Sequence, residues 1–168
     1  VVAYGDVYTN LDLGRLMAFH AGRHRALAPD RSAVTLSLYR VANPSECGLV
    51  TVTDAGEVTR FVEKPPREEV FTDLANAGIC VVDPAVLDYV PSETPYDFGR
   101  HLLPKLLPIG VPVFGYEILE HEFLIDIGTP AGLQRAQVMA ASTRCTSATE
   151  AECAATKNQS QLVGDVAG

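Results

Sequence analysis

The chain has 168 residues, of which 47% are hydrophobic, enough for one folded domain with a core of its own. Its net charge is -8 and it has no basic cluster, which excludes the electrostatic surface that nucleic-acid binding needs. No apolar run approaches the roughly 18 residues of a membrane span, and the first residues lack a basic signal-peptide region, so we expect a cytoplasmic protein.

The first 40 residues have the pattern of a strand, a helix and a second strand. Residues 1–4 form a continuous apolar run, typical of a strand buried on both faces in a parallel sheet. Helical spacing begins after a cap at Thr9 or Asn10 and fades near Gly22. Residues 33–39 then alternate and are rich in β formers, so we predict a βαβ unit.

The middle of the chain predicts a hairpin and one further strand. Residues 48–53 and 57–62 flank the turn sequence Asp54-Ala55-Gly56, which is typical of an antiparallel hairpin. Residues 74–82 form the next apolar strand, which contains small residues where something can approach the backbone.

The rest of the chain continues to alternate between helix and strand patterns. We predict a domain over residues 1–141 and a low-complexity, mobile tail over 142–168. The remaining predicted elements are a helix over 85–90 capped by Asp83, a helix over 98–107 opened by Asp97 and kinked or ended by Pro104, an edge strand over 111–118, an apolar strand from Phe123 that carries Asp126, and a helix from Pro130 to about Ala141 capped by Thr129.

The cysteines and histidines do not point to a metal or a nucleophilic triad. Cys47, Cys80, Cys145 and Cys153 are widely spaced, with no C-x-x-C pair, so neither a zinc site nor a disulfide framework is indicated. We expect His20 to pack on its helix and the other three histidines, His24, His101 and His121, to lie at the surface.

The segment Glu63-Lys64-Pro65 is the strongest candidate for chemistry. It ends an apolar strand, and we expect the proline to hold Lys64 in extended geometry at a strand end, where open sheets bind ligands. A lysine there suits a phosphate, and a glutamate can accept hydrogen bonds from sugar hydroxyls. Taken on its own, the segment is more typical of a surface ion pair at a strand end, and only the other motifs favour a site.

Two aspartates follow apolar strands and can share one edge of the sheet with Lys64. If the strands of Asp6 and Asp126 lie in one mostly parallel sheet, their carboxylates can hold Mg²⁺, whose shell is completed by waters and phosphates. Each aspartate alone is compatible with a turn or a cap. The combination favours attack of one phosphate on another, which needs charge neutralisation and in-line positioning.

Two small or polar residues complete the candidate site. Gly48 can allow close backbone approach, and Asn76 can hydrogen-bond a sugar hydroxyl. Ordinary hairpin and strand irregularities explain both residues as well.

Together these motifs resemble the sugar-1-phosphate nucleotidylyltransferases, in the branch of the mannose-1-phosphate guanylyltransferases and glucose-1-phosphate thymidylyltransferases. The resemblance extends over residues 1–141. The motifs that carry it are, in chain order, Gly5-Asp6, Gly48-Leu49-Val50, Phe61-Val62-Glu63-Lys64-Pro65, Asn76-Ala77-Gly78-Ile79 and Ile125-Asp126-Ile127-Gly128-Thr129-Pro130.

The resemblance implies a fold, a reaction and a set of roles. The fold is a nucleotide-diphospho-sugar transferase fold, an α/β/α sandwich with a mixed, mostly parallel sheet. The reaction couples a sugar 1-phosphate to a nucleoside triphosphate and releases pyrophosphate. The implied magnesium ligands are Asp6 and Asp126, Lys64 contacts the sugar phosphate, and Glu63, Asn76 and Gly48 line the sugar pocket.

One part of the family pattern is missing from the 168 residues. The family begins with a strand and a Gly-Gly-x-Gly-Thr-Arg loop that grips the triphosphate, and no segment here matches it. The chain also opens without an initiator methionine, so we expect a piece whose beginning is missing. We therefore expect little activity from these residues alone, and an exposed sheet edge that favours aggregation or pairing with a second copy.

Two other interpretations stay open at this point. The chain can be a non-catalytic sugar-phosphate or sugar-nucleotide binding module that regulates or scaffolds a partner. It can also be an unrelated receiver-type domain with an acidic metal pocket, although the predicted hairpin argues against such a strictly alternating fold.

Overall fold

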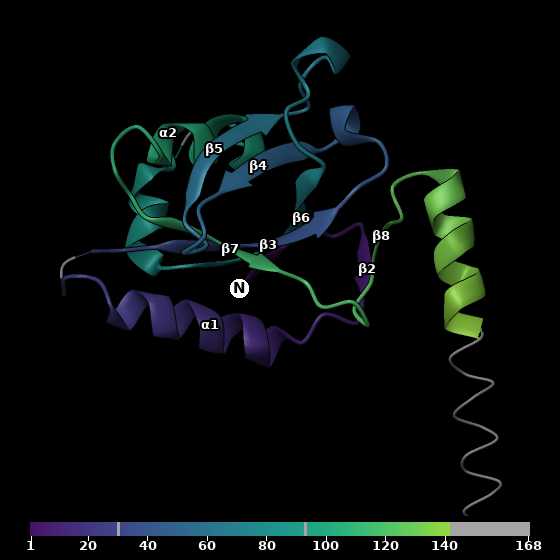
Figure 1. The fold of residues 1–168 in the computed structure, drawn as a ribbon, viewed down its shortest axis with the longest axis horizontal. Helices are drawn as coiled ribbons and strands as arrows, with labels where there is room; N and C mark the ends of the chain where they lie inside the picture. Colours follow the sequence, from purple (N-terminus) through teal and green to yellow (C-terminus); the bar gives the residue numbers. More distant parts are fainter. Residues whose placement is uncertain (30, 93, 142–168) are drawn as a thin grey trace, which may run out of the picture. The chain divides into compact units, whose positions relative to one another are not determined.

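The computed structural model describes residues 1–29, 31–92 and 94–141, and it divides the chain into two compact units, Val1–Leu124 and Ile125–Gly168. Figure 1 shows the elements. The strands are β1 (Val2–Ala3), β2 (Val7–Thr9), β3 (Val34–Arg40), β4 (Gly48–Val52), β5 (Val58–Glu63), β6 (Leu74–Val82), β7 (Val113–Glu117) and β8 (Leu124–Asp126), and the helices are α1 (Leu13–Arg25), α2 (Leu103–Leu106), the 3₁₀ helices η1 (Pro44–Glu46), η2 (Arg67–Glu69) and η3 (Pro84–Tyr89), and the π-helix η4 (Phe98–Leu102).

The main sheet of the first unit has the strand order β5-β4-β6-β3-β7, with β1 also paired to β6. Among the described pairings of this sheet, β3 with β7 is the parallel one; β1 with β6, β3 with β6, β4 with β5 and β4 with β6 are all antiparallel. The prediction of a mostly parallel sheet was therefore wrong. The difference arises from β6, which lies between β1 and β3 and is antiparallel to both. The two strands of the predicted βαβ unit are therefore parallel to each other but are not neighbours.

The strand β1 also differs from its prediction. It has only two residues, of which Val2 is half-buried and Ala3 is exposed, so it is not a strand buried on both faces. The predicted hairpin is confirmed, because β4 and β5 pair in register with Gly48 opposite Glu63. The edge position of β7 is confirmed as well, and the hairpin turn reaches it, since Gly115 N donates to Gly56 O at 2.8 Å.

Helix boundaries follow local capping chemistry. The N-cap of α1 is Asp12, whose carboxylate accepts from Arg15 N, rather than Thr9 or Asn10, and the helix continues to Arg25, past the predicted end at Gly22. Asp97 caps η4 as predicted, through a 2.7 Å hydrogen bond from Arg100 N.

Pro104 does not kink a regular helix. It lies in the first turn of α2, where a missing N–H costs little, and the residues before it form the π-helix.

The second unit contains a helix over residues 130–141. Its predicted cap is confirmed, because Thr129 Oγ1 accepts from Gly132 N at 3.1 Å. The predicted mobile tail, 142–168, lies outside the described residues.

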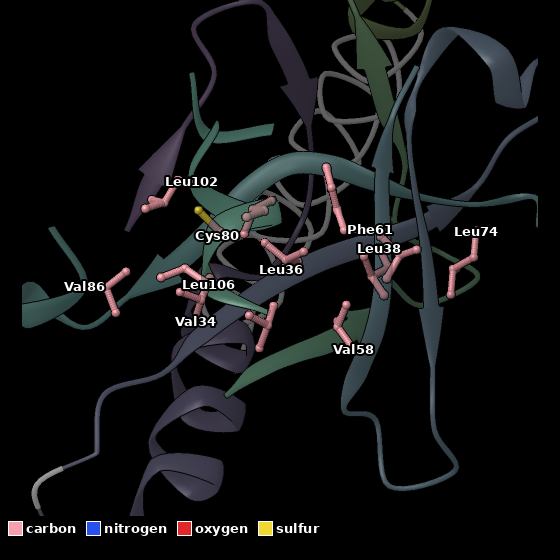
Figure 2. Close-up of a cluster of buried hydrophobic side chains, with 13 residues drawn as sticks. Val34, Leu36, Leu38, Val58, Phe61, Leu74, Cys80, Val86, Leu102 and Leu106 are labelled. Carbon is pink, nitrogen blue, oxygen red and sulfur yellow. The ribbon is translucent and has the colours of Figure 1, made fainter. Parts of the chain in front are cut away.

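Hydrophobic side chains fill both faces of the main sheet. On one face the larger core cluster joins the strands to η4 and α2, and Figure 2 shows its members converging. On the other face Leu11 and Leu16, from α1 and the segment before it, pack with Ile79 of β6. Helices therefore cover both faces of the sheet, as expected for an α/β/α arrangement (Figure 1).

Asp83 has a different role from the predicted helix cap. It makes no side-chain cap to η3. Instead, its carboxylate accepts from Ala33 N at 2.7 Å and lies 3.1 Å from Nε2 of His20 and 3.3 Å from Nε2 of His24. Nδ1 of buried His20 lies 3.0 Å from Thr35 Oγ1, so His20 bonds across to the sheet, and His24 is paired rather than free at the surface.

Candidate functional site

The strand β5 ends at Glu63, and the chain turns sharply at the next residue. Lys64 has a φ of +47°, in the left-handed region, so the prediction that proline holds it in extended geometry was wrong. Lys64 N donates to Cys47 O at 3.1 Å, and Pro65 is buried, so contacts on both sides of Lys64 hold this conformation. A non-glycine residue in this region is strained, and such residues concentrate at functional sites.

β1 and β4 pair with the same edge of β6, so the end of β1 lies near the start of β4. The other edge of β6 is occupied by β3 along its length, from Arg40 opposite Leu74 to Val34 opposite Val82. β1 and β4 must therefore share the remaining edge, where Ala3 faces Ile79 and Leu49 faces Ala75.

The segment between these two pairings is Asn76–Gly78. Tyr4 N donates to Gly78 O at 2.9 Å, which extends the β1 pairing by one residue. Asp6 follows two residues later in an exposed turn. On the β4 side, Gly48 precedes Leu49 and lies opposite Glu63. The register thus brings Asp6, Gly48, Glu63, Lys64 and Asn76 to one stretch of the sheet.

Glu63 occupies a slot that exists because two neighbouring residues have no side chain. A Cβ on Gly48 would lie 2.6 Å from Glu63 Oε2, and a Cβ on Gly99 would lie 2.6 Å from the same atom. Both distances are too short for real Cβ contacts, so glycine is required at both positions if the carboxylate is to stay where it is.

Burial and neighbouring charges set the protonation of Glu63. Burial raises the pKa of its carboxyl above the ordinary value, and Asp97 raises it further, whereas the positive charges of Lys64 and Arg100 lower it. A half-buried carboxyl between two cations and one acid can accept hydrogen bonds from a polar ligand that excludes the remaining water.

Tyr4 adds an aromatic ring to the same place. Its Cδ2 atom lies 2.8 Å from the position of a Cβ on Gly78, which has a φ of +74°, so the ring covers a glycine that has no room for a side chain. Burial raises the pKa of Tyr4 to about 12, with Asp97, Glu63 and Asp6 among the acids that raise it further. The tyrosine hydroxyl therefore keeps its proton at neutral pH.

The remaining predicted residues are placed as follows. Asn76 is half-buried, and its Oδ1 accepts from Gly78 N at 3.3 Å, so its carbonyl end holds the irregular backbone of β6. Asp126 belongs to the second unit, where it is exposed and its Oδ1 accepts from Gly128 N at 2.7 Å. Asp126 ends β8, which is not a strand of the main sheet, so the expectation that the strands of Asp6 and Asp126 lie in one mostly parallel sheet was wrong.

Asp6 and Asp126 each carry an exposed carboxylate, the type of group that binds magnesium in proteins. Across the described ranges no group of three or more His, Cys, Asp or Glu side chains is arranged to hold a metal ion. Magnesium, however, is commonly bound by one or two carboxylates and completes its shell with waters and substrate phosphates, and both aspartates are exposed carboxylates.

The sequence alone missed four residues around Glu63 and Gly78. Tyr4 directly precedes the Gly5-Asp6 motif, so its proximity to a candidate ligand was the available signal. Asp97, Gly99 and Arg100 lie more than 30 residues after Glu63, and only the packing of η4 against the sheet brings them to it.

Comparisons with known proteins identify relatives of one kind. A family model described as "Nucleotidyl transferase" matches residues 1–143. The chain is 34% identical over 128 residues to a UTP--glucose-1-phosphate uridylyltransferase of Synechocystis, covering 76% of this chain and 31% of that protein. It is 33% identical over 136 residues to a mannose-1-phosphate guanylyltransferase of Mycobacterium tuberculosis, covering 80% of this chain and 35% of that protein. The chain thus spans about a third of these curated relatives.

A solved structure shares the fold. It is the crystal structure of a "Putative Glucose-1-Phosphate Thymidylyltransferase" from Bacillus anthracis, which superposes with a TM-score of 0.65 at 21% identity, covering 82% of this chain and 52% of that one. Within the part of the chain that the structure describes, no helix is both long and apolar enough to cross a bilayer.

Proposed function

This chain belongs to the nucleotidyl transferase family, and we propose that it serves the transfer of a nucleotidyl group from a nucleoside triphosphate to a sugar 1-phosphate. In this reaction an oxygen of the sugar phosphate attacks the α-phosphorus, the bond from that phosphorus to the bridging oxygen of the β-phosphate breaks, and pyrophosphate leaves. The product is a nucleoside diphosphate sugar.

The proposal is supported by the strand register: the β4–β5 hairpin end with Gly48, Glu63 and Lys64, and the end of β1 before Asp6, lie on the same side of β6, which carries Asn76. Lys64 supplies a point charge for the sugar phosphate. Glu63, held in its glycine slot, accepts hydrogen bonds from sugar hydroxyls. Asn76 offers its amide N–H₂, because its oxygen is already used by Gly78.

Magnesium is part of the proposal through its ligands. We assign Asp6 and Asp126 as the residues that would hold it, on the family resemblance and on their exposed carboxylates. When bound, Mg²⁺ supplies charge neutralisation between the reacting phosphates, which is the main demand of phosphoryl-type transfer.

Within the proposed reaction, we assign to these 168 residues the binding of the sugar 1-phosphate. They include no match to the Gly-rich triphosphate loop of the family, and they span 31% and 35% of two curated relatives. We therefore propose that the chain binds sugar 1-phosphates by itself and releases little pyrophosphate.

A titration of the purified chain with glucose 1-phosphate and mannose 1-phosphate in Mg²⁺ tests the proposal. We expect binding of at least one of them and a loss of roughly tenfold or more in Lys64→Ala, because a charge-assisted phosphate contact is removed. The matched control is Lys105→Ala in α2, which removes an amine that donates to Tyr89 O. Absence of binding, or an equal loss in the control, would refute the proposed function.

A non-catalytic sugar-phosphate or sugar-nucleotide binding module is the second candidate, because the contacts proposed for Glu63, Lys64 and Asn76 serve binding and do not by themselves require turnover. An assay of the complete translation product of the gene distinguishes the two functions. The transferase requires that this product release pyrophosphate from a nucleoside triphosphate and a sugar 1-phosphate, whereas the binding module binds the sugar phosphate without turnover.

We also propose a cytoplasmic location, because the proposed donor, a nucleoside triphosphate, is supplied there. Pairing of two copies through an exposed sheet edge completes the proposal. Size-exclusion chromatography with light scattering tests the pairing, and a monomer at every concentration would rule it out.

A further inference from the structure

Tyr4 is a large aromatic side chain that stays 41% exposed although its backbone is fixed in the sheet. Its N–H is bonded to Gly78 O, and its ring lies over Gly78, whose missing side chain leaves the space that the ring occupies. The ring is therefore held from below by the sheet, and part of it remains open to solvent.

Carboxylate groups lie on this side of the sheet. The slot of Glu63 between Gly48 and Gly99 lies at the end of the hairpin that adjoins the same edge of β6. Asp97 adds a second carboxylate to this slot, because a Cβ on Gly99 would lie 3.4 Å from Asp97 Oδ1. The Tyr4 ring and its hydroxyl therefore lie along the same edge of the sheet as the carboxylate acceptors of the Glu63 slot.

This combination fits a pyranose better than it fits a phosphate or a purely apolar ligand. A pyranose has C–H groups that pack on an aromatic face and hydroxyls that need donors and acceptors at its rim. The carboxylates of Glu63 and Asp97 repel an anion, so the phosphate is expected at Lys64 and not at Tyr4.

We propose that Tyr4 is a specificity-determining contact for the sugar ring of the sugar 1-phosphate, with its exposed ring against the C–H face and its hydroxyl donating to a sugar oxygen. This inference rests on the proposed function, and it adds a residue that recognises the sugar separately from the phosphate.

Saturation-transfer NMR and titration of the chain with glucose 1-phosphate, mannose 1-phosphate and inorganic phosphate in Mg²⁺ test it. In Tyr4→Leu we expect the affinity for the sugar 1-phosphate to fall by roughly tenfold and saturation transfer to the sugar C–H protons to drop. Binding of inorganic phosphate should not change. Tyr4→Phe keeps the ring and should lose less affinity than Tyr4→Leu.

The control variant is Tyr89→Phe, because Tyr89 lies in η3 and contacts Lys105. Retained phosphate binding shows that a Tyr4 variant is folded, and Tyr4→Phe provides a conservative second variant. Unchanged sugar 1-phosphate affinity in Tyr4→Leu, with binding in the wild type, would overturn this inference alone. If the wild type binds no sugar 1-phosphate, the proposed function and this inference both fail.

Discussion

The carboxylate of Glu63 lies in the space that a side chain on Gly48 would fill, with Oε2 2.6 Å from the position of a Cβ there. The two residues face each other across the β4–β5 hairpin, so the absence of a side chain on one strand decides where the functional group of the other can lie. Gly99 of η4 bounds the same carboxylate from a different element.

Gly99→Ala should move the Glu63 carboxylate without unfolding the protein. The nearest atoms to the new methyl group are the ends of the Glu63 and Asp97 side chains, which can rotate away. We expect sugar 1-phosphate affinity to fall by roughly tenfold, as for the loss of one good polar contact. Calorimetric titration measures the affinity and thermal unfolding the stability.

The control for this variant is Gly22→Ala in α1, where a Cβ would meet nothing within 4 Å. Alanine at a helix interior should stabilise the protein by up to about 1 kcal/mol and leave binding unchanged. Gly99→Ala binding as tightly as the wild type would show that the position of the Glu63 carboxylate does not matter for the ligand.

The burial of Glu63 predicts a specific dependence of stability on pH. Because the folded-state pKa is raised above 4.5, the folded protein holds this proton more tightly than the unfolded chain. The contribution of Glu63 is most favourable below pH 4.5 and is lost as the pH rises through the folded-state pKa. Glu63→Gln should therefore melt at a higher temperature than the wild type at pH 7, and the difference should shrink toward pH 4.

Thermal melts of both proteins between pH 4 and pH 8 check this, and parallel curves would argue against a strained ionised glutamate. The same variant should bind sugar 1-phosphates more weakly, because an amide replaces the carboxylate acceptor. Gain of stability together with loss of binding is the pattern expected of a functional group held at a structural cost.

Two substitutions separate the effect of the left-handed backbone conformation at Lys64 from the effect of its side-chain charge. Both Lys64→Ala and Lys64→Gly remove the amine, but only glycine is unstrained at a φ of +47°. We expect the glycine variant to be more stable than the alanine variant by about 1 kcal/mol, with both binding sugar 1-phosphate equally poorly. Denaturant unfolding gives the difference in stability, and equal stabilities would mean that the strain is relieved elsewhere.

Asp83 should contribute strongly to the stability of the first unit. Its carboxylate accepts from Ala33 N and pairs with His20 and His24, so it joins α1 to the strands β3 and β6. Asp83→Ala should cost about 1–3 kcal/mol, because it leaves a largely buried imidazole and a backbone N–H without their acceptor. Urea unfolding measures this cost against Asp88→Ala, an exposed aspartate of η3, for which a change within about 0.5 kcal/mol is expected. Equal effects of the two substitutions would contradict the role of Asp83.

Local sequence signals predicted most of the elements. The strand over 74–82 has the bounds of β6, the hairpin and its turn are where Gly56 indicated, and Asp97 and Thr129 cap the helices that follow them. These features depend on nearest neighbours in the chain, such as turn chemistry, capping side chains and alternation, and such signals are present in any short window.

The sequence did not reveal the direction and order of the strands. A strand, a helix and a strand suggested parallel neighbours, but the later strand β6 lies between them and reverses most pairings. Pairing partners are chosen by contacts between residues far apart in the chain, so a local pattern cannot rank them.

The sequence by itself determined which groups are available: an acid and an amine at the end of a hairpin, aspartates after apolar runs, and the family to which these motifs belong. Only the tertiary structure decided that Gly48 and Gly99 shape the slot of Glu63, that Lys64 is left-handed and that the ring of Tyr4 covers Gly78. The physical reason is that these are steric relationships between separate segments, and they exist only once the sheet register and the packing of η4 have fixed the distances.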